Sequence, residues 1–382
     1  MSEPTSAEII ASLRQQLATC QQLGIKPVSK QKAKGALYQN DKKGAFKRKN
    51  AVFTNVVKEG GDFPPESGRY VLYVSYACPW ASRCLALLHM KNLTPHIEIC
   101  SVYPTWGRTR ENSDDIHAGW VFVDPEDKKL NVTNTAGYNM IYDSHPALLN
   151  SIIFFTKAVR DIYEMQDQDT HTYSVPIFVD KETKKIVCNE SSIIVEFLNR
   201  AFNKVLPGVN ASLDLSPPHL KEKQEEVNSW IYHDINNGVY KCGFAKSQEA
   251  YQEAFFALYD SLDKLEDHLS KNRYLCGNKL SMADIRLFVT LIRFDEVVYV
   301  VYFKCNGKLI REYPNILGYT REIYQIPGVK ESVSFTHIKN HYYTSHPTHN
   351  LYGVIPIGPR GLKVRKNVWQ KSSHFQHRTE LI

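Results

Sequence analysis

The sequence of 382 residues has no closely paired cysteines. Its eight cysteines stand at positions 20, 78, 84, 100, 188, 242, 276 and 305, and no two of them form a Cys-x-x-Cys pair. This spacing argues against a zinc cluster and against a small disulfide scaffold, so we expect no metal. It fits a reducing compartment, and we expect a cytoplasmic protein in which an exposed cysteine of low pKa is free to react.

Long apolar runs are also missing. No stretch reaches the roughly 18 consecutive apolar residues that a membrane-spanning helix needs, so we expect no membrane partner. The N-terminus, MSEPTSAEIIASLRQQ, lacks a basic leader followed by an apolar block. A secretory signal is therefore not expected, and a mitochondrial one is disfavoured. The 43% hydrophobic and 23% charged content is that of a soluble globular protein, and the length predicts two domains.

The net charge of +7 is unevenly distributed. Residues 30–50 carry eight Lys or Arg and one Asp, and residues 359–382 carry six and one Glu, so the remainder of the chain is acidic. A nucleic-acid-binding protein would not confine its positive charge to two flanks, and we expect no nucleic-acid partner. We interpret both flanks as solvated, flexible extensions, with docking to an anionic partner or a nuclear-import signal as the alternatives.

The first half of the chain reads as a mixed α/β domain. A lead-in, residues 1–62, includes a short amphipathic helix over 6–23. A strand over 70–75, a helix over 81–90 and a strand over 95–102 then form a β-α-β unit. After an irregular excursion with one apolar-periodic helix over 146–165, the segment SVPIFVDKETKKIVCNESSIIVEFLNRAF predicts a hairpin of two strands followed by a helix. This order is typical of a thioredoxin-like domain, which we place at 63–212.

The second half predicts an all-helical domain over 213–335, entered through the proline-rich joint SLDLSPPHL. One helix start is well marked there, because Ser281 can act as the cap and Asp284 follows three residues later. A C-terminal segment, 336–382, carries the basic tail. The predicted fold class is therefore α/β followed by all-α.

The most informative residue is Cys78, in VLYVSYACPWASRCLALLHM, where a strand-like run meets a helix. Pro79 suits the first helical turn, and the unpaired N–H groups and positive dipole of a helix start lower the pKa of a thiol placed there. Because Ala81 stands where a resolving cysteine would be, a second thiol must come from solution. The alternative is a buried structural cysteine, the role that we assign to Cys84.

Two segments further on have both a ligand-binding and a structural interpretation. If the peptide before Pro176 is cis, Val175 can pair its main-chain N–H and C=O with a peptide-like ligand; otherwise the dipeptide is an ordinary strand entry. Glu190 and Ser191 open the next helix, where they either cap it or hold the ammonium and carboxylate of a ligand.

The remaining candidates are aromatic, basic and histidine residues. Trp106 and Trp120 lie in the excursion, where a tryptophan either packs or stacks on a ligand. Arg108 and Arg110 there either meet a ligand carboxylate or serve the loop structure. Three tyrosine-rich segments, GVYKCGFA, RFDEVVYVVYFKCN and HIKNHYYTSH, are packing residues or the wall of a hydroxyl-lined pocket. His341 and His346 are too loosely spaced from other ligands to predict a metal site.

Together these motifs resemble the glutathionyl-hydroquinone reductases, also called Xi-class glutathione transferases and related to the omega class. The resemblance rests on YACPWASR, SVPIFVD with NESSIIVEFLN, GVYKCGFA, RFDEVVYVVYFKCN, REIYQIPGV and HIKNHYYTSH, in that order, and covers about residues 60 to 358. It implies a thioredoxin-like domain followed by a helical glutathione-transferase domain, a homodimer, and glutathione as co-substrate. The implied reaction is reductive removal of glutathione from glutathionyl-hydroquinones.

The resemblance also implies roles for individual residues. Cys78 would be the nucleophile that forms a mixed disulfide with glutathione. Tyr240 would donate a proton to the leaving ring, with Tyr299 and Tyr342 near the sulfur and the phenolic ring. For glutathione, Trp120 would stack on the molecule, Thr172, Tyr173, Ser174 and Val175 would pair with its backbone, and Glu190 and Ser191 would hold its γ-glutamyl end.

That chemistry is coherent for the residues present. A tyrosine hydroxyl can act as general acid toward an aryl carbon, and a second glutathione can resolve the mixed disulfide by thiol–disulfide exchange. Two alternatives remain. An omega-like thioltransferase or dehydroascorbate reductase shares the single thiol without needing the tyrosines, and a non-catalytic interaction module with the same fold would need neither.

Overall fold

The computed structural model describes residues 40–110, 114–123, 132–133, 139–140, 156–167, 169, 171–295, 298–347 and 349–356. The predicted helix over 6–23, the first part of the predicted helix over 146–165 and the basic tail lie outside these residues. Within these ranges, none of the helices is both long and apolar enough to cross a lipid bilayer.

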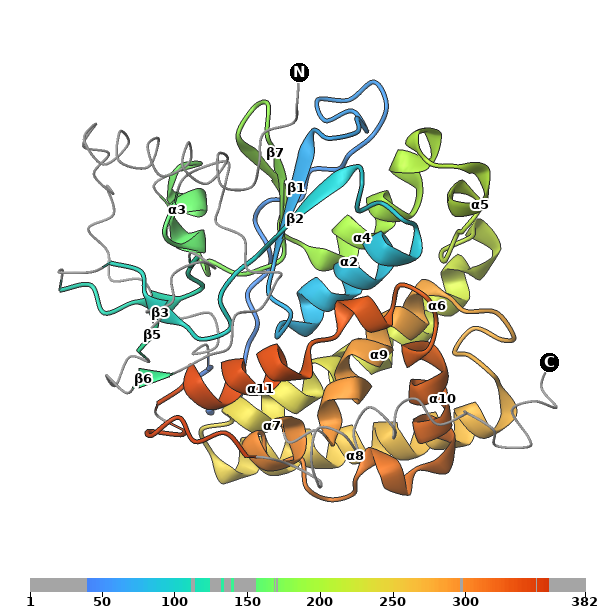
Figure 1. Ribbon diagram of the computed structural model, residues 1–382. Coiled ribbons are helices and arrows are strands. Elements are labelled where there is room, and N and C mark those ends of the chain that lie inside the picture. The colour runs from blue at the N-terminus through green and yellow to red at the C-terminus, as the bar shows by residue number, and fades with distance from the viewer. Residues whose placement is uncertain are drawn as a thin grey trace.

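The first half is built on a four-stranded sheet in the order β2-β1-β7-β8 (Figure 1). The strands are β1 (Tyr70–Val74), β2 (Ile97–Ser101), β7 (Ile177–Asp180) and β8 (Lys185–Cys188). Strand β1 runs parallel to β2 and antiparallel to β7, as the β-α-β unit and the hairpin predicted. All five residues of β1 are buried, which explains its continuous apolar sequence. Helices α2 (Pro79–Met90) and α4 (Ser191–Arg200) pack against each other beside the sheet.

Between β2 and β7 the chain makes the predicted excursion. It contains the short ladders of β3 (Gly107–Arg108) with β4 (Ala118–Gly119) and of β5 (Val132–Thr133) with β6 (Asn139–Met140). Helix α3 covers only Val159–Glu164, so the prediction of a helix through 156–158 was wrong. Ala158 is extended and forms a bridge with Val121, and its N–H donates to the Asp161 carboxylate, which sets the helix start one residue later.

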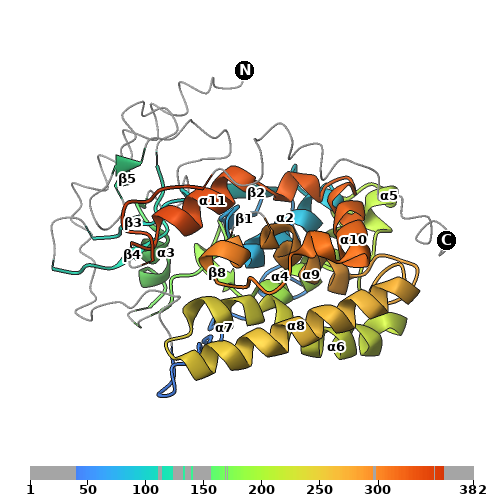
Figure 2. The ribbon, with the colours of Figure 1, turned by 90° about the horizontal axis from the view of Figure 1, so that it is seen from below.

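The second half is helical, as predicted (Figures 1 and 2). Its α-helices are α5 (Gly208–Ala211), α6 (Lys221–Trp230), α7 (Gly238–Phe244), α8 (Gln248–Lys271), α9 (Met282–Phe294), α10 (Pro314–Tyr324) and α11 (Phe335–Thr344). Wider π-helical turns cover Ile231–Asn236 and Val298–Tyr302, and short 3-10 turns cover Ala201–Val205, Pro218–Leu220, Ile310–Glu312 and Lys330–Ser332. The predicted cap of α9 is confirmed, because Asp284 accepts hydrogen bonds from both the N–H and the hydroxyl of Ser281.

One buried side chain joins the two halves at the β1–α2 junction. Arg293 of α9 is fully buried and donates to the carbonyls of Tyr76 and Ala77, at 3.1 and 3.3 Å, and to the hydroxyl of Ser82, at 2.7 Å. These acceptors flank Cys78 on both sides. The helical half therefore fixes the backbone that carries the candidate nucleophile.

Helix α11, the last helix of the helical half that the structure describes, contacts the first half again. The Thr344 and Thr105 hydroxyls are 2.7 Å apart, and the main-chain N–H of Trp106 donates to the Ser345 hydroxyl at 3.0 Å. The Nδ1 of His341 lies 2.9 Å from the Pro104 carbonyl oxygen. Helix α11 is thus attached to the segment that follows β2.

Residues 40–50 form an arm that packs on the helical half, beside α7 in Figure 2. The Asn40 amide donates to the Phe244 carbonyl at 2.7 Å, and the Lys246 N–H donates to the Gly44 carbonyl at 2.9 Å. Phe46 is buried between rings of α7. The prediction of a solvated extension was therefore wrong for this part of the basic stretch, because an aromatic side chain among the lysines anchors it.

Candidate active site

Cys78 is the N-cap of α2, directly before Pro79, as the sequence predicted. The residue as a whole is partly exposed. Its Sγ lies 3.4 Å from the carbonyl oxygen of Val175, to which the thiol donates. The Val175–Pro176 peptide is cis. Cys78, the candidate nucleophile, is therefore in direct contact with Val175, which is expected to pair with the glutathione backbone.

The pKa of Cys78 has contributions of both signs. Burial raises the pKa above its usual value, and it outweighs the N–H groups of Ala81 and Trp80 and the guanidinium groups of Arg293 and Arg48, which lower it. The predicted influence of the helix start is present in those two N–H groups. The predicted net direction was wrong, because sequence does not reveal how deeply the thiol is buried. Cys84, six residues further along α2, is fully buried, in agreement with a packing role.

A cavity of about 520 Å³ lies beside this junction, within the size range of small-molecule sites. Five predicted glutathione residues line it: Thr172, Ser174, Val175, Glu190 and Ser191. Further lining residues come from α6, the following π-helical turn and the arm: Glu225, Asn228, Ser229, Tyr232 and residues 48–51. The cavity thus lies between the two halves, with the arm along its edge.

Glu190 is the N-cap of α4, and its carboxylate accepts from both the N–H and the hydroxyl of Ser192, at 2.9 and 2.8 Å. The capping interpretation is therefore confirmed. The same side chain lines the cavity beside Ser191, at the positive end of α4. Capping and ligand binding are compatible here, since a carboxylate can accept several hydrogen bonds at once.

Two predicted glutathione residues lie away from the cavity wall. The Trp120 ring stacks on the ring of His341, with centroids 4.4 Å apart, and meets the edge of Trp106. Tyr173 has a left-handed backbone, with φ of 47°, and is only 3% exposed. Its hydroxyl donates to Glu164 of α3 at 3.1 Å.

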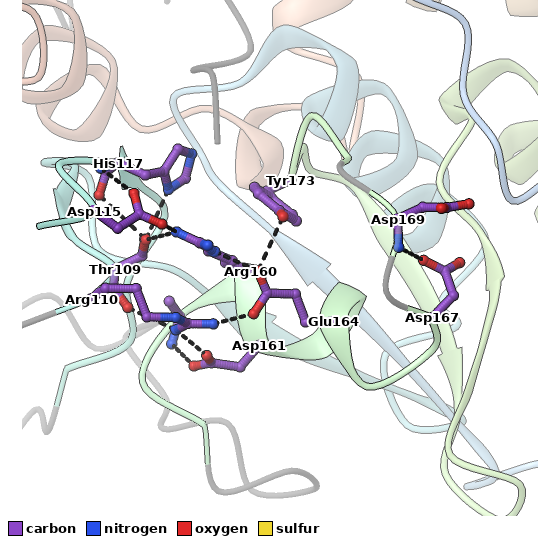
Figure 3. Close-up of polar contacts among 11 residues, drawn as sticks. Thr109, Arg110, Asp115, His117, Arg160, Asp161, Glu164, Asp167, Asp169 and Tyr173 are labelled. Atoms are coloured by element: carbon purple, nitrogen blue, oxygen red, sulfur yellow. Dashed lines mark hydrogen bonds and ion pairs between the residues drawn. The ribbon is translucent and has the colours of Figure 1, made fainter. Parts of the chain in front are cut away.

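Tyr173 belongs to a network that ties the excursion to α3 (Figure 3). Arg160 pairs with Asp115 and with Glu164, both at 2.6 Å, and Arg110 pairs with Asp161 at 2.6 Å and also with Glu164. Arg110 therefore serves the loop structure, the second of its two interpretations. Burial and the neighbouring Arg160 lower the pKa of His117, in the same network, to about 4.

The three predicted tyrosines meet in one cluster although they come from three elements. The hydroxyls of Tyr240 (α7) and Tyr342 (α11) are 2.7 Å apart, and the Tyr299 ring lies 6.2 and 6.4 Å from theirs. Burial raises the pKa of each phenol well above its usual value, and the nearby Cys78 raises those of Tyr240 and Tyr342 further. All three hydroxyls therefore stay protonated at neutral pH.

Sequence reasoning missed two arginines whose charge acts on Cys78, Arg48 and Arg293, and a third, Arg83, that contacts the nearby Trp80. Arg293 was read as part of an apolar helix, and Arg83 as part of α2. Arg48 lies in the arm, outside the quoted motifs. The guanidinium carbons of Arg48 and Arg83 each lie 4.6 Å from the Trp80 ring centre. The only signal in the sequence was Trp80, two residues after the candidate nucleophile.

Comparison with known proteins agrees with this fold and site. Residues 248–322 match the family model "Glutathione S-transferase, C-terminal domain". Glutathionyl-hydroquinone reductase YqjG of Escherichia coli is 40% identical over 325 residues, which cover 83% of this chain and 89% of that protein. Glutathione S-transferase omega-like 2 of Schizosaccharomyces pombe is 36% identical and covers 84% of this chain and 95% of its own.

Solved structures give the same result. The crystal structure of the glutathione transferase Xi from Phanerochaete chrysosporium superposes with a TM-score of 0.72 and 43% identity, covering 82% of this chain and 98% of that one. The glutathione-bound structure of YqjG superposes with a TM-score of 0.72 and 37% identity, covering 85% and 96%.

The fold and the single cysteine at a helix start define a glutathione transferase of the thiol-bearing kind. Within that class, the chain belongs to the Xi glutathione transferases, the family of the glutathionyl-hydroquinone reductases. Within the described ranges, no three His, Cys, Asp or Glu residues form a group that could hold a metal ion.

Proposed function

We propose that this protein reductively removes glutathione from glutathionyl-hydroquinones, with free glutathione as the second thiol. The observation that carries the proposal is the meeting of three groups at the β1–α2 junction. The Cys78 thiol contacts the Val175 carbonyl. The Tyr240 ring lies 6.2 Å from the ring of Trp80, two residues after Cys78, and the Tyr240 hydroxyl is 2.7 Å from that of Tyr342. The name of the E. coli relative supports the choice of substrate.

The binding step uses the cavity wall next to Cys78. The main chain at Thr172, Ser174 and Val175 pairs with the glutathione backbone. Glu190 holds the γ-glutamyl ammonium while Ser191, at the start of α4, binds its carboxylate through the positive helix end. This arrangement directs the glutathione sulfur toward Cys78.

In the first chemical step, the Cys78 thiolate attacks the glutathione sulfur. A sulfur–sulfur bond forms, the bond between sulfur and the ring carbon breaks, and the ring carbon takes a proton from the Tyr240 hydroxyl. The two sulfurs are thereby oxidised and the ring is reduced. Tyr342 supports the donor through its hydrogen bond to Tyr240. A second glutathione thiolate then attacks the mixed disulfide, releases oxidised glutathione and restores the Cys78 thiolate.

The test is steady-state reduction of a glutathionyl-hydroquinone with glutathione. We expect Cys78→Ser to fall to the uncatalysed rate, while Cys84→Ala, a buried cysteine on the same helix, keeps its activity. Without free glutathione, the wild type should gain the mass of one glutathione on Cys78. An active Cys78→Ser variant would refute the mechanism.

A second candidate is an omega-like thioltransferase, which the name of the S. pombe relative supports. The two functions differ in their need for a proton donor. When a disulfide substrate is attacked, the leaving group is a thiolate and needs no proton, whereas the ring carbon of a glutathionyl-hydroquinone must be protonated. Tyr240→Phe should lower turnover of the glutathionyl-hydroquinone about 10²- to 10⁴-fold and leave reduction of hydroxyethyl disulfide nearly unchanged. Equal wild-type rates on both substrates would favour the thioltransferase.

We also propose a cytoplasmic homodimer. Six of the described cysteines, Cys78, Cys84, Cys188, Cys242, Cys276 and Cys305, form no disulfide, which fits a reducing compartment. Light scattering coupled to size-exclusion chromatography should give twice the chain mass of 43.9 kDa, and a single-chain mass would refute the dimer.

A further inference from the structure

Arg48 reaches the candidate active site from the arm. Its guanidinium carbon lies 4.6 Å from the ring centre of Trp80 and 4.9 Å from that of Tyr240. Its Nε donates to the side-chain oxygen of Asn237 at 3.1 Å. Trp80 and Tyr240 thus both contact the Arg48 guanidinium, which Asn237 at the start of α7 holds in place.

Arg48 also lines the cavity, and one of its guanidinium nitrogens has no hydrogen-bond acceptor among the described residues. That nitrogen, Nη2, is buried. Arg48 also lowers the pKa of both Cys78 and Tyr240, so its charge acts on both reacting groups. A buried guanidinium N–H without an acceptor is costly, which favours an acceptor supplied by the ligand.

The surroundings indicate which acceptor fits. Arg48 lies among aromatic rings, with Phe46 at 5.5 Å in addition to Trp80 and Tyr240. Of these three rings, Trp80 lines the cavity, and the face of a tryptophan is suited to a planar ring. A guanidinium beside that face is suited to an oxygen on the ring. Thr172, Ser174, Val175, Glu190 and Ser191 line the same cavity.

We propose that Arg48 is a further catalytic residue, which binds the phenolic oxygen next to the sulfur-bearing ring carbon. This inference rests on the proposed function. Tyr240 protonates that carbon and recovers a proton from the adjacent hydroxyl, so that the ring becomes a ketone. As the Cys78 thiolate attacks the sulfur, the electron pair of the carbon–sulfur bond moves into the ring and the ketone oxygen becomes a phenolate. Arg48 neutralises that charge, and the phenolate takes up from solvent the proton that the Cys78 thiol had released, and leaves as the hydroquinone.

The test compares Arg48→Gln with the wild type on three substrates that all require Cys78. On the glutathionyl-hydroquinone, we expect kcat/KM to fall about 10²- to 10³-fold, the loss typical of one missing oxyanion donor. On a mixed disulfide of glutathione and mercaptoethanol, which has no ring oxygen, it should fall no more than about twofold to threefold. On a glutathionyl-hydroquinone methylated at the adjacent oxygen, wild type and variant should react at the same slow rate, because the group that Arg48 serves is missing.

Two further variants are controls. Lys47→Gln removes the neighbouring positive charge, on an exposed side chain that pairs with Asp41, and should behave as the wild type on all substrates. Arg48→Lys keeps the charge without the planar donors and should recover part of the loss. Equal thermal midpoints of the variants establish that the arm stays folded.

Three outcomes overturn the inference. An equal loss on the mixed disulfide would mean that Arg48 acts only on the Cys78 thiol. A raised KM for glutathione with unchanged kcat would mean that it binds a glutathione carboxylate, and wild-type behaviour of Arg48→Gln would mean that it has no role. Failure of the proposed function is distinguishable, because the wild type itself would then not reduce the glutathionyl-hydroquinone.

Discussion

Substitution of Arg293 measures how the helical half affects the stability of the β1–α2 junction and the pKa of Cys78, the candidate nucleophile. Arg293→Met keeps most of the side-chain volume but removes the donors to Tyr76, Ala77 and Ser82. Hydrogen bonds to charged groups contribute about 1.5–3 kcal/mol each, and their loss leaves buried carbonyls without donors. With partial relaxation, we expect the free energy of unfolding to fall by about 3–5 kcal/mol, the range seen when one partner of a buried charged contact is removed.

The same substitution has a second effect, on acidity. Because the Arg293 guanidinium lowers the pKa of Cys78, its removal raises that pKa further. The thiolate is the reactive form, so the rising limb of the pH–rate profile should move to higher pH. Urea unfolding measures the first effect, and the pH dependence of kcat/KM measures the second.

Matched variants separate charge from geometry. Arg293→Lys restores the positive charge without the fork of donors, so it should recover the pH profile more fully than the stability. Arg311→Met, on an exposed arginine, should change neither. If Arg293→Met unfolds at the wild-type urea concentration and keeps the wild-type pH profile, the argument that α9 fixes the β1–α2 junction is refuted.

Three further predictions concern the support of the site. Gly44→Ala should destabilise the protein by about 1–2 kcal/mol, measured by thermal melting, because φ is +83° and a Cβ would meet Ser247 N at 3.0 Å; an unchanged midpoint would contradict the docked arm. Arg160→Met should raise KM for glutathione more than it lowers kcat, since the network holds Tyr173 beside the glutathione segment; a pure kcat effect in initial-rate kinetics would contradict this. His117 has its pKa lowered to about 4, so its contribution to stability is fully present above about pH 6.5, the usual His pKa, and declines as the pH falls toward 4. The loss reaches about 3 kcal/mol by pH 4, and His117→Gln should remove that part of the pH dependence of urea unfolding.

Local signals account for most of what the sequence predicted. The apolar run of β1, Pro79 after Cys78 and the Ser281–Asp284 cap each lie within a few residues of the feature that they determine. The tyrosine-rich segments suggested a hydroxyl-lined pocket, but which tyrosines meet there could be predicted only through resemblance, since Tyr240, Tyr299 and Tyr342 are far apart along the chain. Arg48 and Arg293 were missed for that reason, because an arginine in a basic stretch or in an apolar helix carries no local mark of its distant partners.

The acidity of Cys78 was mispredicted for a different reason. The helix start is visible in sequence, whereas the depth of burial depends on both halves of the protein. Likewise, the start of α3 depends on Val121 and Asp161 rather than on apolar periodicity alone. In each case a tertiary contact overrode a correct local pattern.

The arm has a consequence for how the protein is made. Its residues leave the ribosome early, yet Asn40 binds Phe244, 204 residues later. Domains generally fold from the N-terminus during synthesis, so the sheet and Cys78 can assemble while the docking surface on α7 does not yet exist. Arg48 can take its place only after the first helices of the second half have emerged. The part of the cavity that Arg48 lines is therefore completed only late in translation, after α7 has formed.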